Sequence, residues 1–151
     1  MSLILADEGA EFILDDFWND TAKTFKVKLY TNNVTPADGD QVAGFTIATG
    51  GGYTDSTLDD ATATATDALA IPTISSVSGI AQVEWTPLIW TFTGALTTNP
   101  TIYGYIVTDS TSNFLLFAER LSSSYTPSVA GDTLSLTLRF KMGNVADAGS
   151  I

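Results

Sequence analysis

The chain has 151 residues, of which 44% are hydrophobic, so one domain of this size can bury a substantial core without disulfides or metals. It contains no cysteine and no histidine, which excludes thiolate metal sites, thiol nucleophiles and the commonest general base. Seventeen acidic residues against six basic ones give a net charge of −11, which repels phosphate backbones and anionic lipid surfaces. We therefore expect neither a nucleic acid partner nor a membrane partner.

The first predicted element is a helix over residues 6–20. Its apolar side chains recur at helical spacing and would form one stripe: Ala10, Ile13, Leu14, Phe17 and Trp18. All six of its charged residues are acidic, and three of them stand near its start, where they complement the positive end of the helix dipole. No basic region precedes it, so we do not expect a secretory signal. We interpret residues 1–22 as a helical arm that docks through Ile13, Leu14, Phe17 and Trp18.

After the helix the apolar period changes from 3.6 to 2, which predicts strands. Over residues 24–29, apolar side chains alternate with Lys26 and Lys28. Short or edge strands are expected within residues 55–66. Further strands, each bounded by turn-forming residues, are predicted at residues 71–76, 80–85, 88–93, 101–108, 114–121 and 133–142.

About eight short strands with no helix between them predict an antiparallel sandwich or barrel. We expect an all-β fold, an antiparallel β-sandwich with one short N-terminal α-helix. A jelly roll is the first choice, and an immunoglobulin-like sandwich fits the same spacing. The β-sandwich domain is expected to cover residues 23–151.

Two loops stand out between the first strands. Residues 32–40 contain proline and Asp-Gly, which predict a turn. Asp38 and Asp40 could supply oxygen ligands to calcium, but the ligand spacing of an EF-hand loop is missing and a turn is a sufficient explanation. The run Gly50-Gly51-Gly52 is not followed by lysine and a hydroxyl residue, so it does not resemble a phosphate-binding loop. We expect a flexible loop there, and no metal or cofactor at either place.

Four of the six basic residues lie on the polar faces of the first and last strong strands: Lys26, Lys28, Arg139 and Lys141. If those strands are neighbours, the four side chains form one basic stripe. Such a stripe either keeps an edge strand solvated or receives an acidic helix from this chain or from a neighbouring subunit.

Catalytic chemistry has little support in the sequence. A glycosidase needs two carboxylates at a defined separation, and the acids in strands or loops that could supply them are Asp55, Asp59, Asp60, Glu84 and Glu119. An acidic protein has such pairs by chance, so we predict no catalytic residue and no enzyme. Most of the aromatic residues between 85 and 117 alternate within strands, which favours core positions over a glycan-binding surface.

Five segments resemble a family of small tailed-phage structural proteins: residues 29–36 (LYTNNVTP), 90–94 (WTFTG), 101–109 (TIYGYIVTD), 115–120 (LLFAER) and 131–136 (GDTLSL). The resemblance covers roughly residues 3–142, and that family also opens with a short helix before the first strand. Its motifs are strand and turn motifs, so they describe a scaffold and not a chemistry.

The resemblance implies a capsid decoration, or cement, protein on the outer surface of the virion capsid. Its partners would be the major capsid protein and copies of itself, a homo-oligomer for which a trimer is one candidate. The alternative is a tail or baseplate module that binds a receptor or glycan.

Overall fold

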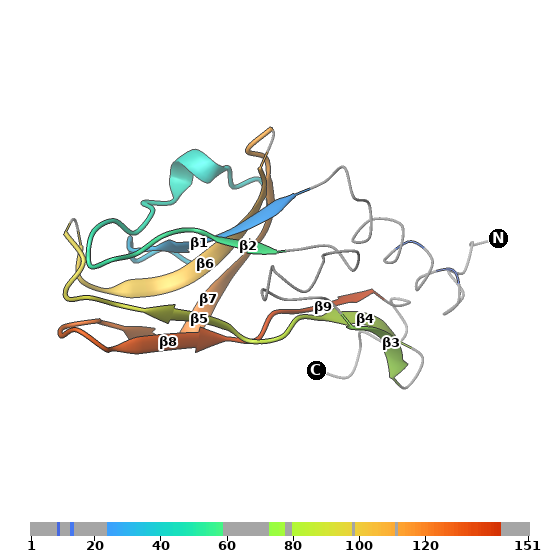
Figure 1. Cartoon of the computed structure of the whole chain (residues 1–151). Coiled ribbons are helices and arrows are strands. Elements are labelled where there is room, and N and C mark those ends of the chain that lie inside the picture. The colour runs from blue at the N-terminus through green and yellow to red at the C-terminus, as the bar shows by residue number, and fades with distance from the viewer. Residues whose placement is uncertain are drawn as a thin grey trace. The chain divides into compact units, whose positions relative to one another are not determined.

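The computed structural model describes residues 24–58, 73–77, 80–97, 99–110 and 112–142, together with Gly9 and Ile13. Its elements, shown in Figure 1, are β1 (Phe25–Tyr30), η1 (Val42–Gly44), β2 (Ser56–Leu58), β3 (Thr73–Val77), β4 (Ile80–Glu84), β5 (Leu88–Thr91), β6 (Ile102–Asp109), β7 (Leu115–Tyr125), β8 (Thr133–Leu136) and β9 (Arg139–Met142). Strands in antiparallel sheets dominate this part of the chain, which confirms the all-β class. The predicted helix over residues 6–20 lies outside the described residues, apart from Gly9 and Ile13, and stays a prediction.

The chain divides into two compact units. Of the described residues, the larger unit contains 24–58, 89–97, 99–110 and 112–136. The smaller unit contains 73–77, 80–88 and 137–142, together with Gly9 and Ile13. The expected boundary between an arm at residues 1–22 and a domain at residues 23–151 falls outside the described residues and stays a prediction.

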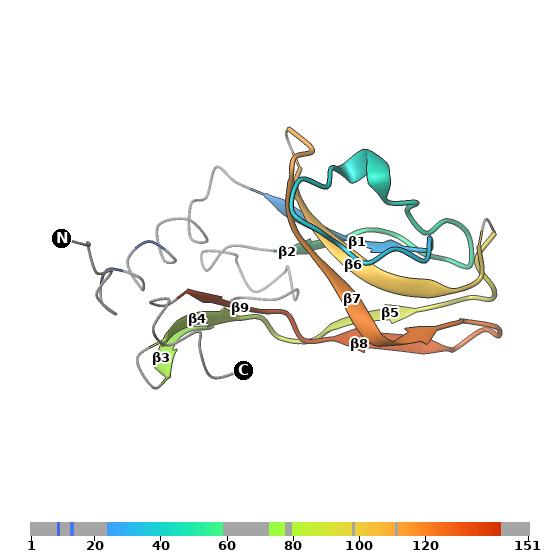
Figure 2. The same cartoon turned by 180° about the vertical axis from the view of Figure 1, so that it is seen from behind.

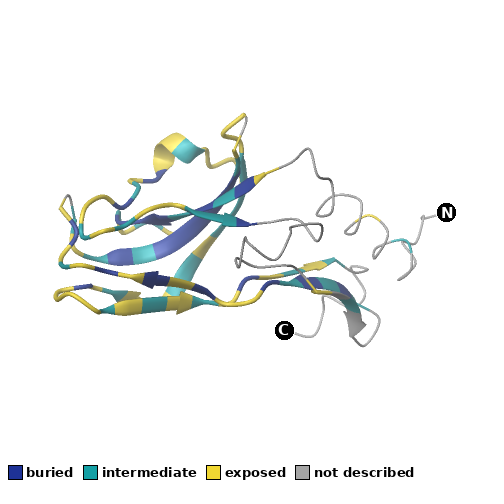
Figure 3. Cartoon of the chain, viewed as in Figure 1, coloured by how far each residue is buried: buried dark blue, intermediate teal, exposed yellow. Residues whose placement is uncertain are grey.

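A four-stranded sheet in the order β2-β1-β6-β7 forms the centre of the larger unit. In β1, Phe25, Val27 and Leu29 are buried on one face, while Lys26 and Lys28 are only half-buried (Figure 3). Each apolar residue of β1 meets a partner on a neighbouring strand, because the registers pair residue 27 with 107 and residue 29 with 105. The alternation predicted for this strand is therefore confirmed.

The pair β5-β8 belongs to the larger unit except for its first residue, Leu88. Trp90 is buried, and its indole nitrogen donates a hydrogen bond to the carbonyl oxygen of Thr54 (3.0 Å). Phe92, just beyond β5, packs against Tyr125 at the end of β7, with ring centroids 6.1 Å apart. These contacts connect β5 to the chain around the four-stranded sheet, and Figure 2 shows the same strands from behind.

The second face of the four-stranded sheet is covered in part by the segment over residues 31–47. Tyr30, Phe45 and Ile106 form a buried cluster there, and the rings of Tyr30 and Phe45 lie 5.0 Å apart. Tyr30 stands opposite Gly104 on β6. A Cβ atom at Gly104 would lie 2.3 Å from the Tyr30 hydroxyl and 2.2 Å from the carbonyl oxygen of Glu119, so only glycine leaves room for the tyrosine ring.

The glycine run at residues 50–52 forms a tight turn with a defined conformation, in place of the flexible loop that we expected. All three glycines have positive φ, and Thr93 donates its backbone N–H to the carbonyl oxygen of Gly51 (2.8 Å). A Cβ atom at Gly51 would lie 2.5 Å from the carbonyl oxygen of Gly94. The close approach of a second backbone, and not flexibility, explains glycine here.

The smaller unit contains a three-stranded sheet in the order β3-β4-β9. Its pairs include Glu84 with Arg139, and Ala81 and Val83 are buried on the opposite face of β4. The prediction of one continuous strand over residues 133–142 is wrong. This segment is divided into β8 and β9, which belong to different sheets. β9 pairs with β4 and β8 pairs with β5, and Pro87 lies between β4 and β5. Because a proline has no N–H, it cannot continue the hydrogen-bond ladder, so the pairing is interrupted there.

Candidate functional site

The four residues of the predicted basic stripe lie in two different sheets. Lys26 and Lys28 are on β1, whose neighbours are β2 and β6, whereas Arg139 and Lys141 are on β9, which pairs with β4. The condition on which a stripe depended, that the two strands are neighbours in a sheet, is therefore not met. Sequence alternation assigns a face to each strand, but it does not say which strands pair.

Two of the four basic side chains have partners of their own within the described residues. Lys28 donates its ammonium to the Oδ1 atom of Asn113 (2.9 Å), and Arg139 forms an ion pair with Glu84 directly across the ladder. Of the apolar residues assigned to the helical arm, Ile13 is described and is 44% exposed. Leu14, Phe17 and Trp18 lie outside the described residues, so the docking role of the arm stays a prediction.

The carboxylates that we considered for catalysis also have structural partners. Glu84 pairs with Arg139, Glu119 accepts a hydrogen bond from the Tyr105 hydroxyl, and Asp55 accepts one from Tyr53 (3.0 Å). Asp59 and Asp60 lie outside the described residues. Among the described residues, no group of three or more acidic side chains is placed to hold a metal ion.

The half-buried Tyr53 and the buried Tyr105 connect separate segments of the chain through their hydroxyl groups. The Tyr53 hydroxyl accepts the backbone N–H of Leu29 (2.8 Å) and donates to Asp55. Burial raises the pKa of Tyr53 above its ordinary value, and the Asp55 carboxylate raises it further. Burial and the neighbouring Glu119 raise the pKa of Tyr105 in the same direction. Both hydroxyls therefore stay protonated and act as hydrogen-bond donors.

Arg120 on β7 holds the segment that follows β1. Its guanidinium donates to the carbonyl oxygen of Val34 (2.7 Å) and to the Oδ1 atom of Asn33 (2.6 Å), and it lies 5.3 Å from the centre of the Tyr103 ring. The side chain of Asn32 adds bonds to Gly44 and Thr46, both 2.8 Å long. We did not predict a role for Arg120. The one feature of the sequence that could have indicated this role is the position of Arg120, a basic residue just after the apolar first half of the strand.

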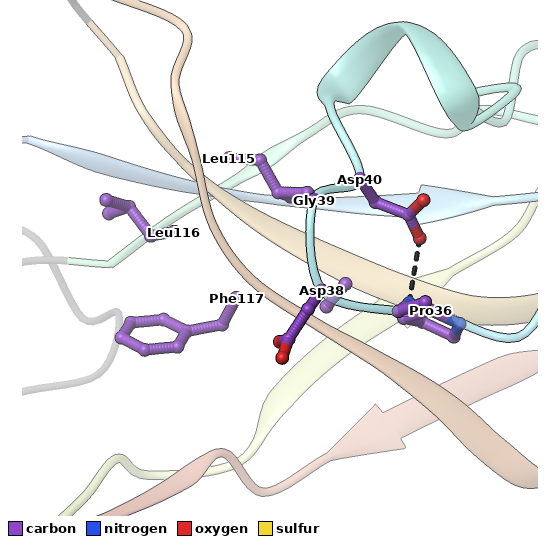
Figure 4. Close-up of a pocket in the computed structure, with 9 residues that line it drawn as sticks. Pro36, Asp38, Gly39, Asp40, Leu115, Leu116 and Phe117 are labelled. Carbon is purple, nitrogen blue, oxygen red and sulfur yellow. Dashed lines mark hydrogen bonds between the residues drawn. The ribbon is translucent and has the colours of Figure 1, made fainter.

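A hollow lies between the predicted loop and the first half of β7 (Figure 4). It has a volume of about 380 Å³ and is lined by residues 36–40 and 115–118. A second hollow of about 370 Å³ is lined by residues 40–43 and 112–115, so the two share Asp40 and Leu115. We call the two hollows together the β7 groove.

Aspartates are the only charged residues that line the β7 groove. Asp40 accepts the backbone N–H of Ala37 (2.8 Å), which closes the turn predicted at this position and is drawn as the dashed line in Figure 4. Asp38 is exposed on the same turn. At the other end of the groove, Phe114 is 71% exposed.

Most of the aromatic residues considered for glycan binding are in the core. Trp85, Trp90, Phe92 and Tyr105 are buried, which confirms the core interpretation for these four. Phe114 is the one aromatic side chain among the large exposed hydrophobic residues of the described part.

No family model, curated protein or solved structure matches this chain. The described residues include no helix that is long and apolar enough to cross a membrane.

Proposed function

We propose that this chain is a structural protein of a phage particle, a decoration protein that binds the outer face of the major capsid protein shell and stabilises it. The observation that carries the proposal is that the five segments with the phage-like pattern contact one another in two groups within the larger unit: the first with the third and fourth, and the second with the fifth. A pattern spread over separate parts of a chain is more informative when those parts contact one another.

Three contacts connect these segments. Arg120, in the fourth segment, binds Asn33 and Val34 in the first. Gly104, in the third, lies against the Tyr30 ring of the first. Phe92, in the second, exchanges backbone hydrogen bonds of 2.8 Å each with Gly131 and Asp132 at the start of the fifth.

The architecture that we propose for the larger unit is an antiparallel sandwich, with a jelly roll as its first choice. The contacts from Trp90 to Thr54 and from Phe92 to Tyr125 support two layers, because they join the β5 segment to chain belonging to the four-stranded sheet and its connections. A scaffold of this kind presents loops on a rigid frame, which suits a protein that covers a preformed surface.

Charge and side-chain chemistry support a structural role over a catalytic one. The charge of −11 favours a position away from packaged nucleic acid. The carboxylates Asp55, Glu84 and Glu119 bind partners of their own chain, so their hydrogen-bonding capacity serves the fold. On this proposal the protein acts through shape and contacts with the shell and with its own copies.

Immunogold labelling of intact particles tests the proposal. Antibodies raised against the purified chain should label the capsid faces of phage from the source lysate. Label confined to the tail tip would favour the receptor-binding alternative, for which the exposed ring of Phe114 is the supporting observation. Particles without label at any position would refute both proposals.

A truncation addresses the N-terminal arm. We expect deletion of residues 1–20 to leave a β-type circular dichroism spectrum, because the strands begin at Phe25, and to weaken attachment to shells or oligomer formation. Replacement of Ile13, Leu14 and Phe17 together by serine should have the same effect. An insoluble truncated product would show that the arm belongs to the core of its own chain instead.

A further inference from the structure

At the open edge of β7, some backbone N–H and C=O groups point away from the sheet. The hydrogen bonds of β6 with its neighbours show which residues these are. Ser110, after β6, donates its N–H to Thr24, just before β1 (2.8 Å). Asp109 donates its N–H to Phe114, just before β7 (3.1 Å). Backbone groups alternate in direction along a strand, so the odd-numbered residues of β6 face β7.

Alternation on β6 fixes the direction of the groups on β7. Tyr105 is odd-numbered and stands opposite Glu119, so the backbone groups of Glu119 face β6. The adjacent Ala118 and Arg120 therefore direct their N–H and C=O groups to the other side. In the described part of the chain, β7 is the last strand of its sheet on that side.

The β7 groove lies along this edge and has a consistent chemistry. Residues 115–118 form one wall, and the turn over residues 36–40 forms the other. Asp38 and Asp40 are the charged residues of its lining. At the other end, Phe114 adds an exposed ring, and the Lys28 ammonium binds the lining residue Asn113 (2.9 Å). The groove thus combines backbone groups that can continue a sheet with negative charge beside them.

We infer that the β7 groove binds an extended, basic segment of a partner protein, which adds a strand to the sheet beside β7. Main-chain hydrogen bonds to Ala118 and Arg120 would hold the added strand, and its lysine or arginine side chains would meet Asp38 and Asp40. Strand addition at a sheet edge takes affinity from the main chain and specificity from alternate side chains. The inference is independent of the proposed function, because it concerns the groove and not the particle.

Charge complementarity selects this occupant. A second copy of the chain brings a net charge of −11 to a groove whose charged lining is negative, so self-pairing along β7 is disfavoured. A basic segment is attracted by the same aspartates. Because a strand edge offers backbone hydrogen bonds, an extended segment fits it better than a helix does.

A titration with a defined peptide tests the charge requirement. The probe is an eight-residue peptide of alternating lysine and valine, capped at both ends and labelled for fluorescence anisotropy, added to the full chain. We expect it to bind at low salt and the matched glutamate-valine peptide not to bind. Asp38→Asn should weaken binding by about threefold, the size of an exposed ion pair. Asp55→Asn, which removes a charge on another loop, should leave binding unchanged.

Two further measurements test the main-chain pairing. Methylation of every internal backbone nitrogen of the lysine-valine peptide keeps its charge but removes the donors on both edges, so the methylated peptide should bind far more weakly. In the complex, hydrogen exchange should slow at the amides of Ala118 and Arg120 and stay unchanged at Glu119, whose N–H already faces β6.

Three results would each overturn the inference. These are the absence of lysine-valine binding, equal binding of the methylated peptide, and equal binding by the Asp38→Asn variant. Concentration-dependent protection of Ala118 and Arg120 in the protein alone would also overturn it, because the edge would then be occupied by a second copy.

Discussion

Replacing Arg120 by alanine should release the segment that follows β1. The substitution removes a half-buried hydrogen bond to Val34, an exposed one to Asn33 and the contact with the Tyr103 ring. Hydrogen bonds from a charged group contribute about 1–2 kcal/mol each at such sites, and an exposed cation–π contact contributes about 0.5 kcal/mol. We therefore expect Arg120→Ala to lower the free energy of unfolding by about 3 kcal/mol.

Urea unfolding followed by tryptophan fluorescence measures this change, with two variants as comparisons. Arg120→Lys keeps the charge but not the two-pronged geometry, so it should lose about half as much stability. Lys28→Ala removes a cation whose bond to Asn113 is exposed, and it should cost less than about 1 kcal/mol. The amide of Thr46 reports on the same segment, because it is bonded to the Asn32 side chain. A loss of unfolding free energy below about 1 kcal/mol for Arg120→Ala, or unchanged hydrogen exchange at the Thr46 amide, would refute the reasoning.

Three other predictions concern stability. Gly104→Ala should cost about 3 kcal/mol or more, because the new Cβ atom would collide with the Tyr30 ring and a backbone oxygen, whereas Gly44→Ala, which meets nothing within 4 Å, should be nearly neutral in thermal unfolding. Tyr53→Phe should cost about 1–2 kcal/mol in urea unfolding, because it removes the acceptor of a strand N–H. Backbone N–H groups hold the pKa of Asp132 below its ordinary value, so its stabilisation is complete above the unfolded pKa of about 3.9 and is lost as the pH falls through the folded value. Urea midpoints of wild type and Asp132→Asn should therefore converge at the acid end of a pH 2–6 series and separate above it.

Local patterns in the sequence were enough to predict most of the strands. The alternation around Lys26 and Lys28 gave the buried face of β1, and the proline and Asp-Gly signals gave the turn over residues 36–40. These features depend on neighbours along the chain. Pro87 marks the break between β4 and β5, because a ladder stops where one strand lacks a donor. Applying that break to residues 133–142 requires the knowledge that these two segments pair.

Pairings between distant segments were beyond local patterns. Nothing near Arg139 shows that its strand pairs with β4 and not with β1, so the basic stripe could not be tested from the sequence. The role of Arg120 depends on a carbonyl 86 residues away in the chain. The glycine run likewise required knowledge of the backbone at Gly94, which approaches it from another loop.

The long-range contacts of the segment after β1 also determine when it can adopt its structure. Arg120 reaches Val34 and Asn33 across 86 and 87 residues, and Asn99 reaches Thr31 across 68. At a synthesis rate of about 5–20 residues per second, this segment leaves the ribosome roughly 4–17 seconds before Arg120 does. For most of that interval, until β6 has been synthesised, the Tyr30 ring has no β6 to cover, and the apolar face of β1 stays exposed. The larger unit should therefore fold only after β7 is synthesised, and shortened chains that end before Arg120 should be prone to aggregation.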